Sequence, residues 1–529
     1  MQRRSFLAGA ATALTAPLAA PRIAAAQGTR VLKFVPDADL ASLDPVWTTS
    51  YQTRDHGYMV YDTLYGQDSK FRAAPQMLEG AVVEDDGRRW KLALRNGLKF
   101  HDGERVLAAD CIASIKRWGA RDSFGQALMA AVDEMAVIDD RTFSIRLKYP
   151  FPLLPEALSK TAPLMCAIMP ARLAETDPFR QVPEIVGSGP FRFKPDERMP
   201  GARVVWERNA DYLPRPNGTP DRTTGPKIVN FDRVEWLIMP DSSTVSSALQ
   251  RGEVDWWYSP PADLQPLLAK ARGVKTEVIV PTGTIATMRF NHLQPPFNNP
   301  AIRRAMFAAI TQSDYMTAVA GEDRSRWRDG VGYFCPGAPM ASDAGMERLT
   351  GKRDLDQAKR DLAAAGYKGE RVVLLGPMDI PSTRALAEVT ADLLKRLGVN
   401  LDFQAMDWAT VVQRRIKTEP VDQGGWSIFQ TSWSGLDQFN PAGHAFLRAN
   451  GRNASPGWPS SEKLEELRDA WLKAPDLAGQ KKLAEQIQLQ AFEDVPYIPL
   501  GQTISATAFR SELAGMLDGL PLFWNIRRS

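Results

Sequence analysis

Residues 94–118 constrain the fold of this chain more than any other stretch of the sequence. The segment before them, residues 90–94, alternates apolar and polar side chains, as a half-buried strand does. Asn96-Gly97 predicts a tight turn, because both residues tolerate a positive φ. A short strand over residues 98–100 and a helix over residues 108–118 are expected to follow. The sequence therefore predicts a strand-turn-strand-helix unit.

As a whole string, LRNGLKFHDGERVLAADCIASIKRW resembles the signature of the family 5 extracellular solute-binding proteins, the peptide- and nickel-binding components of bacterial ABC importers. Three shorter strings resemble recurrent family strings as well: GSGPF at residues 187–191, NADY at residues 209–212 and GEVD at residues 252–255. The resemblance implies an α/β, two-lobed periplasmic-binding-protein fold of type II, class C-like, with an extra subdomain in the first lobe.

The first 26 residues have the pattern of an export signal. Residues 2–7, QRRSFL, resemble a twin-arginine motif, and a weakly apolar, alanine-rich stretch follows over residues 8–20. Residues 24–26 are all alanine and fit a small-residue cleavage site, so the mature chain is expected to begin near Gln27. The apolar stretch is too short for a membrane span, and no cysteine marks a lipoprotein anchor. We therefore expect a periplasmic protein that is exported by the twin-arginine route.

Charge and composition limit the partners of the chain. The formal net charge is +3, and the leader carries three arginines and no acidic residue, so the chain without its leader is neutral. Because phosphate binding needs a basic surface, this argues against nucleic acid as a partner. A globular chain of 529 residues exceeds what one core usually covers and implies two or three domains. We expect a monomer.

No local motif indicates catalysis, a cofactor or a metal. The spacings typical of metal ligands are absent among the histidines, which are His56, His101, His292 and His444. Neither a GxSxG elbow nor a Walker sequence occurs. The three cysteines do not describe a disulfide framework, although one bridge between two of them is an open alternative. We expect no enzyme, with a triad assembled from distant residues as the alternative that a sequence leaves open.

The resemblance also divides the chain into segments. After the leader, residues 1–26, it implies a first lobe built from residues 27–72, 186–281 and 500–529, an extra subdomain at residues 73–185, and a second lobe at residues 282–499. Within the second lobe, helices expected at residues 356–365 and 383–397 alternate with strands expected at residues 371–375 and 399–403. This alternation predicts parallel pairing.

A first candidate site lies in the loop that precedes a helix expected at residues 56–64. The loop combines stacking surface with hydroxyl groups in Trp47, Thr48, Thr49, Ser50 and Tyr51. On its residues alone, it could line a ligand site or be an ordinary surface loop. In the family, the loop after the first strand faces the cleft. The resemblance therefore implies ligand contacts for Trp47, Thr49, Ser50 and Tyr51.

A second candidate site lies at residues 425–437, where a strand leads into a glycine loop. Trp426 is expected in the core. Trp433-Ser434-Gly435 resembles the family's WxGD-type motif, whose aspartate, in peptide-binding members, receives the peptide's amino terminus through a charge-assisted hydrogen bond. The matching position here is Leu436, and Asp437 comes one residue later. Trp433 and Asp437 are predicted ligand contacts, and whether Asp437 replaces the family's aspartate stays open.

Two further positions complete the predicted site. Asp407-Trp408 resembles a family position where an aromatic residue flanks the bound chain. Arg414 and Arg415 lie near the place where some members hold an arginine for a ligand carboxylate, although an arginine pair is also typical of a solvated helix face. We include Trp408 and Arg415 among the predicted ligand contacts.

Together these features predict a binding protein that captures a short peptide or a related small solute between two lobes. Hinge closure on the ligand would then present the closed form to a membrane ABC permease. A nickel chelate, an opine and an oligosaccharide are alternative ligands, and the scarcity of histidines argues against bare metal. The alternative functions are a periplasmic hydrolase and a chaperone or sensor on the same fold.

Overall fold

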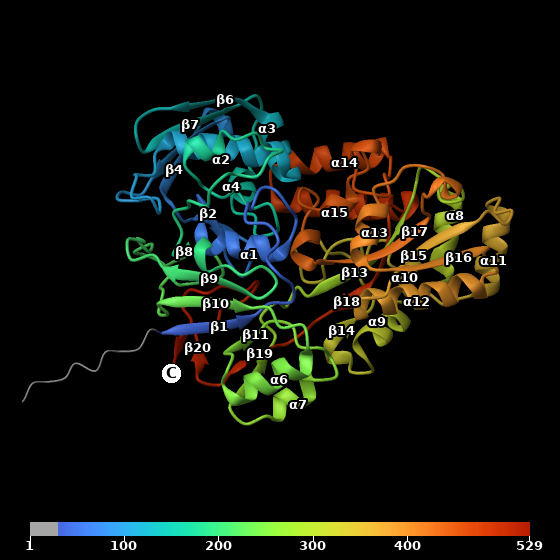
Figure 1. Ribbon diagram of the computed structural model, residues 1–529. Helices are drawn as coiled ribbons and strands as arrows, with labels where there is room; N and C mark the ends of the chain where they lie inside the picture. The colour runs from blue at the N-terminus through green and yellow to red at the C-terminus, as the bar shows by residue number, and fades with distance from the viewer. Residues whose placement is uncertain (1–29) are drawn as a thin grey trace, which may run out of the picture.

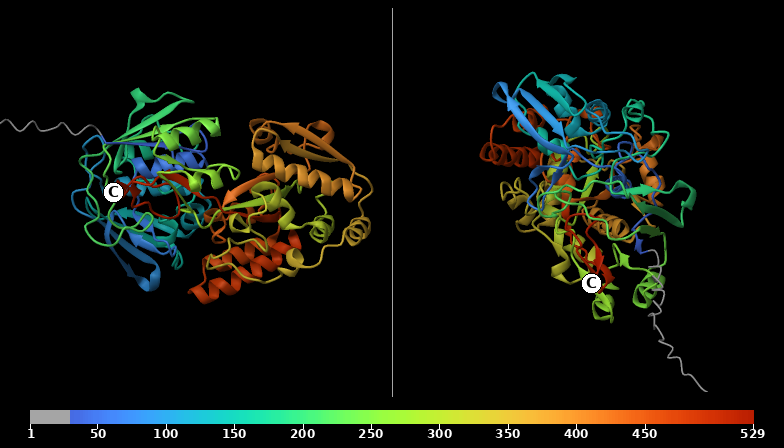
Figure 2. Two further views of the ribbon diagram at one scale, coloured as in Figure 1. Left: turned by 90° about the horizontal axis from the view of Figure 1, so that it is seen from below. Right: turned by 90° about the vertical axis from the view of Figure 1, so that its left-hand side faces the viewer.

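The computed structural model describes residues 30–529 and forms two lobes, each with a large sheet (Figure 1). The predicted leader therefore lies outside the described residues. In Figure 1 the body that carries β1, β9 and β10 lies beside the body that carries β13, β15 and β17. Figure 2 separates the same two bodies when the molecule is viewed from below. No helix within residues 30–529 combines the length and the apolar character that a membrane crossing requires.

The first large sheet has seven strands in the order β12-β19-β11-β1-β10-β9-β8. Their bounds are β1 (Val31–Val35), β8 (Phe191–Phe193), β9 (Arg203–Arg208), β10 (Arg233–Leu237), β11 (Trp256–Trp257), β12 (Val274–Glu277) and β19 (Thr507–Arg510). β1 is parallel to β10 and to β11, and the other pairs are antiparallel. A cluster of buried aromatic rings that includes Phe34, Trp206, Trp236 and Phe523 packs on this sheet. The helices of this body are α1 (Tyr51–Val60), α6 (Ser242–Arg251) and α7 (Gln265–Lys270).

The second large sheet has six strands in the order β14-β18-β13-β17-β15-β16. Their bounds are β13 (Thr284–Phe290), β14 (Trp327–Arg328), β15 (Val372–Pro377), β16 (Leu401–Met406), β17 (Ile428–Ser434) and β18 (Ile498–Thr503). β15 pairs in parallel with β16 and β17, which confirms the predicted parallel pairing, while β13, β14 and β18 add antiparallel pairs. Trp426 is fully buried against Phe429 and Trp458, as predicted. The helices of this body are α8 (Pro300–Ala305), α9 (Gln312–Ala320), α10 (Glu347–Thr350), α11 (Leu355–Ala364), α12 (Pro381–Arg396), α13 (Trp408–Arg414), α14 (Glu462–Leu472) and α15 (Leu477–Asp494).

A separate antiparallel sheet of four strands, in the order β4-β5-β7-β6, contains the signature unit. Its strands are β4 (Leu78–Glu84), β5 (Arg89–Leu94), β6 (Val132–Val137) and β7 (Thr142–Leu147), with the helices α2 (Ala108–Arg121), α3 (Ser123–Ala131), α4 (Leu154–Leu158) and α5 (Ala171–Ala174) nearby. The strand and helix predicted at 90–94 and 108–118 are confirmed. The predicted strand at 98–100 is wrong: only one bridge, Lys99 to Arg105, forms there. The bonds of this bridge run from the Phe100 N–H to the Glu104 carbonyl and from the Val106 N–H to the Leu98 carbonyl, and the turn at residues 101–103 ends the pairing at once. Two small ribbons complete the chain, formed by β2 (Tyr65–Gln67) with β3 (Ala73–Pro75) and by β20 (Leu513–Ala514) with β21 (Arg527–Arg528).

The backbone at residues 187–189 passes so close to the end of α1 that positions 187 and 189 require glycine. The Gly189 N–H donates to the carbonyl of Val60, the last residue of the helix, over 2.8 Å. A Cβ added at Gly187 would lie 2.0 Å from that carbonyl oxygen, and one added at Gly189 would lie 2.6 Å from the Val60 carbonyl carbon. Only glycine permits this approach of two backbones. Correspondingly, α1 begins at Tyr51 and ends at Val60, earlier than the helix expected at 56–64.

The chain passes between the two large sheets twice. β12 ends in the first sheet at Glu277, and β13 begins in the second at Thr284. On the return, β18 stays in the second sheet to Thr503, and β19 joins the first at Thr507. The return crossing between the sheets therefore lies at residues 504–506.

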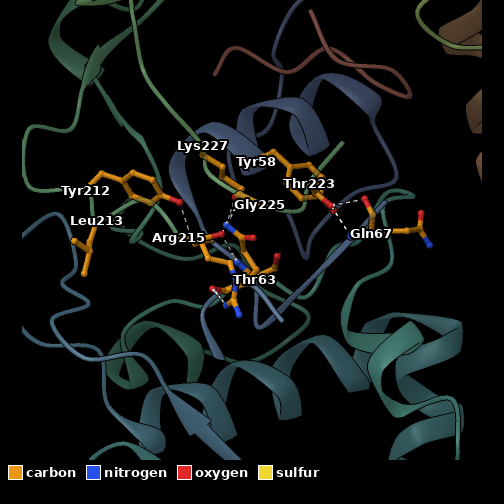
Figure 3. Close-up of polar contacts among 12 residues, drawn as sticks. Tyr58, Thr63, Gln67, Tyr212, Leu213, Arg215, Thr223, Gly225 and Lys227 are labelled. Carbon is orange, nitrogen blue, oxygen red and sulfur yellow. Dashed lines mark hydrogen bonds and ion pairs between the residues drawn. The ribbon is translucent and has the colours of Figure 1, made fainter. Parts of the chain in front are cut away.

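A buried ion pair links distant segments of the first lobe. The ammonium of Lys227 lies 2.7 Å from a carboxylate oxygen of Asp62, and both side chains have at most 1% of their surface exposed. The hydroxyl of Tyr212 donates to the other oxygen of Asp62 over 2.9 Å, and Lys227 also lies 4.7 Å from the ring centroid of Trp524. Figure 3 shows Lys227 and Tyr212 in this group of polar contacts. The pair holds the end of α1, the segment after β9 and the C-terminal segment together.

Lys227→Met is expected to lower the free energy of unfolding by about 3–5 kcal/mol, because it leaves Asp62 as a buried charge without its cation. Adding Asp62→Asn to that variant should restore part of the loss, since the charge is then removed as well. Urea unfolding of the wild type and both variants measures these differences. Equal losses in the single and double variants would contradict the argument.

Candidate functional site

A cavity of about 640 Å³ lies between the two lobes. The first lobe side contributes residues 48–51, the junction of α2 with α3, and Lys160. The second lobe side contributes α13 with Arg415, the end of β17, Asp437, and the loop at residues 443–456. Since both sides supply walls, the cavity exists in this form only when the lobes lie together.

The structure brings seven of the eight predicted site residues to this cavity. These are Thr49, Ser50, Tyr51, Trp408, Arg415, Trp433 and Asp437. The eighth, Trp47, is not among the lining residues. Its ring lies 5.3 Å from the guanidinium carbon of Arg121, and its carbonyl accepts a hydrogen bond from Arg121 over 3.0 Å. Trp47 thus contacts a residue that lines the cavity but does not line the cavity itself.

Tyr51 joins the lobes through its hydroxyl group. The residue is the first of α1 and not a loop residue, because Ser50 keeps the extended backbone that precedes a helix. Its hydroxyl donates to a carboxylate oxygen of Asp437 over 2.5 Å and accepts from the Ser434 N–H over 2.8 Å. One side chain of the first lobe therefore satisfies two polar groups of the second.

A short turn at Gly435–Gln438 decides where Asp437 points. The Ser434 hydroxyl accepts from the Leu436 N–H at its start, so the segment is no longer a strand. A Cβ at Gly435 would lie 2.1 Å from the Thr282 carbonyl oxygen, which makes glycine necessary here. Asp437 therefore lines the cavity despite the one-residue offset, while Leu436 lines a smaller cavity beside it.

The environment of Asp437 raises the pKa of its carboxyl group. Burial raises the pKa of this carboxyl, and the hydrogen bond from Tyr51 and the positive charge of Lys160 oppose that shift only in part. Burial and the nearby carboxylate also raise the pKa of the Tyr51 hydroxyl well above its usual value. The phenol therefore keeps its proton and acts as the donor to Asp437.

Lys160 and Asp122 form a second polar group on the first-lobe wall. They are in direct ionic contact. Asp122 also caps α3, because its carboxylate accepts from the Phe124 and Gly125 N–H groups over 2.9 and 3.0 Å. Lys160 donates to the Pro163 carbonyl over 2.8 Å. Both charges are thus compensated within the protein.

Arg415 and its neighbour Arg414 differ in their hydrogen-bond partners. Arg414 donates to the carbonyls of Gly424 and Gly425 over 3.1 and 2.9 Å, which fixes the chain after α13. The guanidinium carbon of Arg415 lies 5.8 Å from the ring centroid of Trp408 and 6.0 Å from that of Phe429. Its Nε is buried and has no hydrogen-bond partner within the described residues, and burial lowers its pKa. A cation in this position is suited to an anionic group of a ligand.

Sequence reasoning missed several lining residues. On β17, the alternation of Phe429, Thr431 and Trp433 was the signal that could have extended the predicted site, since alternate residues share a face. Arg121 ends the signature helix, but nothing in the sequence reveals which way it faces. Arg448 and the rest of the 443–456 loop carry no periodic pattern and reach the cavity only through the fold.

The histidines and cysteines lie away from metal-binding geometry. Within residues 30–529, no group of three His, Cys, Asp or Glu side chains is arranged to hold a metal ion. Burial lowers the pKa of His56 and of His444 to about 3, and both are hydrogen-bonded inside the core. Cys111, Cys166 and Cys335 are buried and unbonded to one another.

Comparisons with known proteins agree on one family. The family described as bacterial extracellular solute-binding proteins, family 5 Middle, matches residues 72–454. A probable peptide ABC transporter periplasmic-binding protein, y4tO of Sinorhizobium fredii, is 37% identical over 100% of this chain and 98% of its own. Among solved structures, the PBP AgaA of A. tumefaciens R10 in complex with agropinic acid has a TM-score of 0.77 at 20% identity and covers 94% of this chain and 99% of its own. The dipeptide-binding protein of Pseudoalteromonas sp. SM9913 in complex with Met-Leu has a TM-score of 0.77 at 19% identity and covers 94% and 100%. These two structures share the fold.

The melting temperature of the Asp437→Asn variant, compared with that of the wild type at the same pH, should increase as the pH rises from about 4 to about 8. A carboxyl with a raised pKa in the folded protein contributes stability at low pH, and that contribution is lost as the pH rises through the folded pKa. The amide cannot ionise and avoids this loss. Melting temperatures of the ligand-free proteins measure the effect. The exposed Asp263→Asn serves as the control, and a constant difference between Asp437→Asn and wild type would contradict the assignment.

Proposed function

Because the chain belongs to the family 5 bacterial extracellular solute-binding proteins, we propose that it captures a short peptide or a related small solute and delivers it to the permease of an ABC importer. Proteins of this family are binding components of transport systems and not enzymes. The observation that carries the proposal is the cavity between the lobes, whose walls come from both. Closure around a ligand is the step that such a cavity serves.

The lining of the cavity suits a small organic solute. Aromatic rings from Trp408, Phe429, Trp433 and Phe446 supply apolar contact. Hydroxyl groups from residues 48–51 and from Thr431 and Ser432 supply hydrogen bonds that set orientation. The relative from Sinorhizobium fredii, named for peptide transport, supports a peptide as the first ligand class, and an opine is the alternative.

We further propose that the lobes follow the two large sheets and that the four-stranded sheet is an extra subdomain of the first lobe. The hinge would then lie in the two crossings, at residues 278–283 and 504–506. Export by the twin-arginine route rests on the QRRSFL motif, and the absence of a nucleic-acid partner rests on the neutral charge of the chain without its leader. A monomeric state is proposed with them. Retention of the precursor in a strain without that route would support the export proposal.

Native mass spectrometry of the protein purified from its own periplasm tests the function. A small molecule that is released by mild denaturation supports solute capture and identifies its class. Turnover of a peptide or ester panel, abolished by one nucleophile substitution, would instead support a hydrolase. Capture of unfolded chains would favour the chaperone alternative.

Trp433→Ala is expected to weaken binding of the released ligand by at least about tenfold, because an aromatic wall of the cavity is lost. The ring centroid of Trp433 lies 4.4 Å from that of Phe446. Because Trp433 is only half-buried, the melting temperature of the empty protein should change little. Trp426→Ala is the matched control: it empties a fully buried site and should lower the melting temperature strongly. Calorimetric titration and thermal unfolding measure both. A large loss of stability without loss of affinity in Trp433→Ala would assign this ring to the core.

A further inference from the structure

The charged side chains that reach the cavity between the lobes are mostly cations. Two acidic side chains, Asp122 and Asp437, line it, against four basic side chains, Arg121, Lys160, Arg415 and Arg448. A wall of this composition has a positive potential, unless other groups of the protein compensate it.

Two of the cations have a carboxylate partner inside the protein. Lys160 is in ionic contact with Asp122. Arg448 lies 3.3 Å from Glu465 on α14, a carboxylate that it shares with Arg468. Arg121 and Arg415 remain, and neither lies within 4.0 Å of a carboxylate among residues 30–529. These two arginines are therefore the lining cations that have no carboxylate partner among the described residues.

The two arginines face the cavity from opposite lobes. Arg121 is the last residue of α2, and Arg415 directly follows α13. Apart from its bond to the Trp47 carbonyl, Arg121 contacts aromatic rings, with its guanidinium carbon 4.8 Å from the ring centroid of Phe179. Closure of the lobes thus brings two uncompensated cations to one cavity of limited size. Two anionic groups of a ligand would remove this repulsion and fill the open donor positions of the guanidinium groups.

Asp437, in contrast, is poorly placed to receive an ammonium group. One of its oxygens already accepts the Tyr51 hydroxyl, and its side chain is only 3% exposed. Lys160 is near enough to act on it electrostatically. An ammonium group of a ligand would have to share this carboxylate with Tyr51 and approach Lys160, and both conditions oppose binding.

We propose that the cavity takes a small dicarboxylate without a free ammonium group, such as an N-acylated amino acid that carries a second carboxylate. One carboxylate binds Arg415 and the other binds Arg121, so that the ligand bridges the lobes. This inference rests on the solute-binding function proposed above and names the chemical class of the solute.

Three probes of matched shape test the inference. Glutarylglycine has two carboxylates and no ammonium group, γ-glutamylglycine adds only the α-ammonium group, and pentanoylglycine lacks only the distal carboxylate. Calorimetric titration of the purified protein should show glutarylglycine binding at least about tenfold more tightly than either of the others. Equal or tighter binding of γ-glutamylglycine would overturn the exclusion of the ammonium group. Equal binding of pentanoylglycine, or no binding of any probe, would overturn the dicarboxylate assignment.

Variants then assign the two carboxylates. Arg415→Gln and Arg121→Gln should each weaken glutarylglycine binding by about tenfold or more, and the variant that has lost the site of the distal carboxylate should no longer prefer glutarylglycine over pentanoylglycine. Arg360→Gln, on the exposed face of α11, is the control and should leave binding unchanged. Unchanged affinity in Arg415→Gln, with its melting temperature retained, would overturn the proposal. A released periplasmic ligand with a free ammonium group would also overturn it, while the proposed transport function would stand.

Discussion

The two crossings between the large sheets set the geometry on which the cavity depends. They lie side by side, because Thr284 at the start of β13 pairs with Thr503 at the end of β18. A Cβ at Gly283, whose φ is 49°, would lie 2.1 Å from the Thr503 carbonyl oxygen, so the two backbones pass in direct contact. Adjacent crossings leave the lobes one common axis of rotation. Rotation at the proposed hinge would therefore open and close the cavity without changing either sheet.

Contacts on both sides of the cavity hold the lobes together in this structure. Tyr51 and Asp437 supply the polar contact, and the rings of Phe71 and Phe439 stack across the lobes with centroids 3.7 Å apart. The polar contact removes the Asp437 carboxyl from water, and the raised pKa of this group reflects the loss of hydration. The hydrogen bond from the Tyr51 hydroxyl offsets that loss only in part. The uncompensated cations Arg121 and Arg415 act against closure. From these opposing contributions we expect an anionic ligand to favour the closed form, and this is the behaviour that a transport receptor needs.

Local patterns predicted much of the fold, and the failures have local causes. The alternation before residue 94 and the amphipathic helix after residue 108 are β5 and α2, because one face of each is buried. The strand expected at 98–100 failed because the 101–103 turn closes at once. The helix expected at 56–64 begins earlier, at Tyr51, since its early turns are buried between polar partners and do not show an apolar stripe. Most predicted site residues reached the cavity, whereas Arg121, Lys160 and Arg448 depended on how distant segments pack.

Asp437, one residue beyond the place that the motif resemblance implies, shows how a local turn decides the chemistry of a site. A strand would have turned the carboxylate away, but the turn that begins at Gly435 brings it back to the cavity. There it meets Tyr51 of the opposite lobe, so the acid serves lobe closure. With this carboxylate occupied, the remaining uncompensated charges of the cavity are positive. A binding protein discriminates by the difference in affinity between ligands, and here an ammonium group would lose its hydration and would have to share Asp437 with Tyr51. The same lining that rejects that group leaves two guanidinium groups for carboxylates.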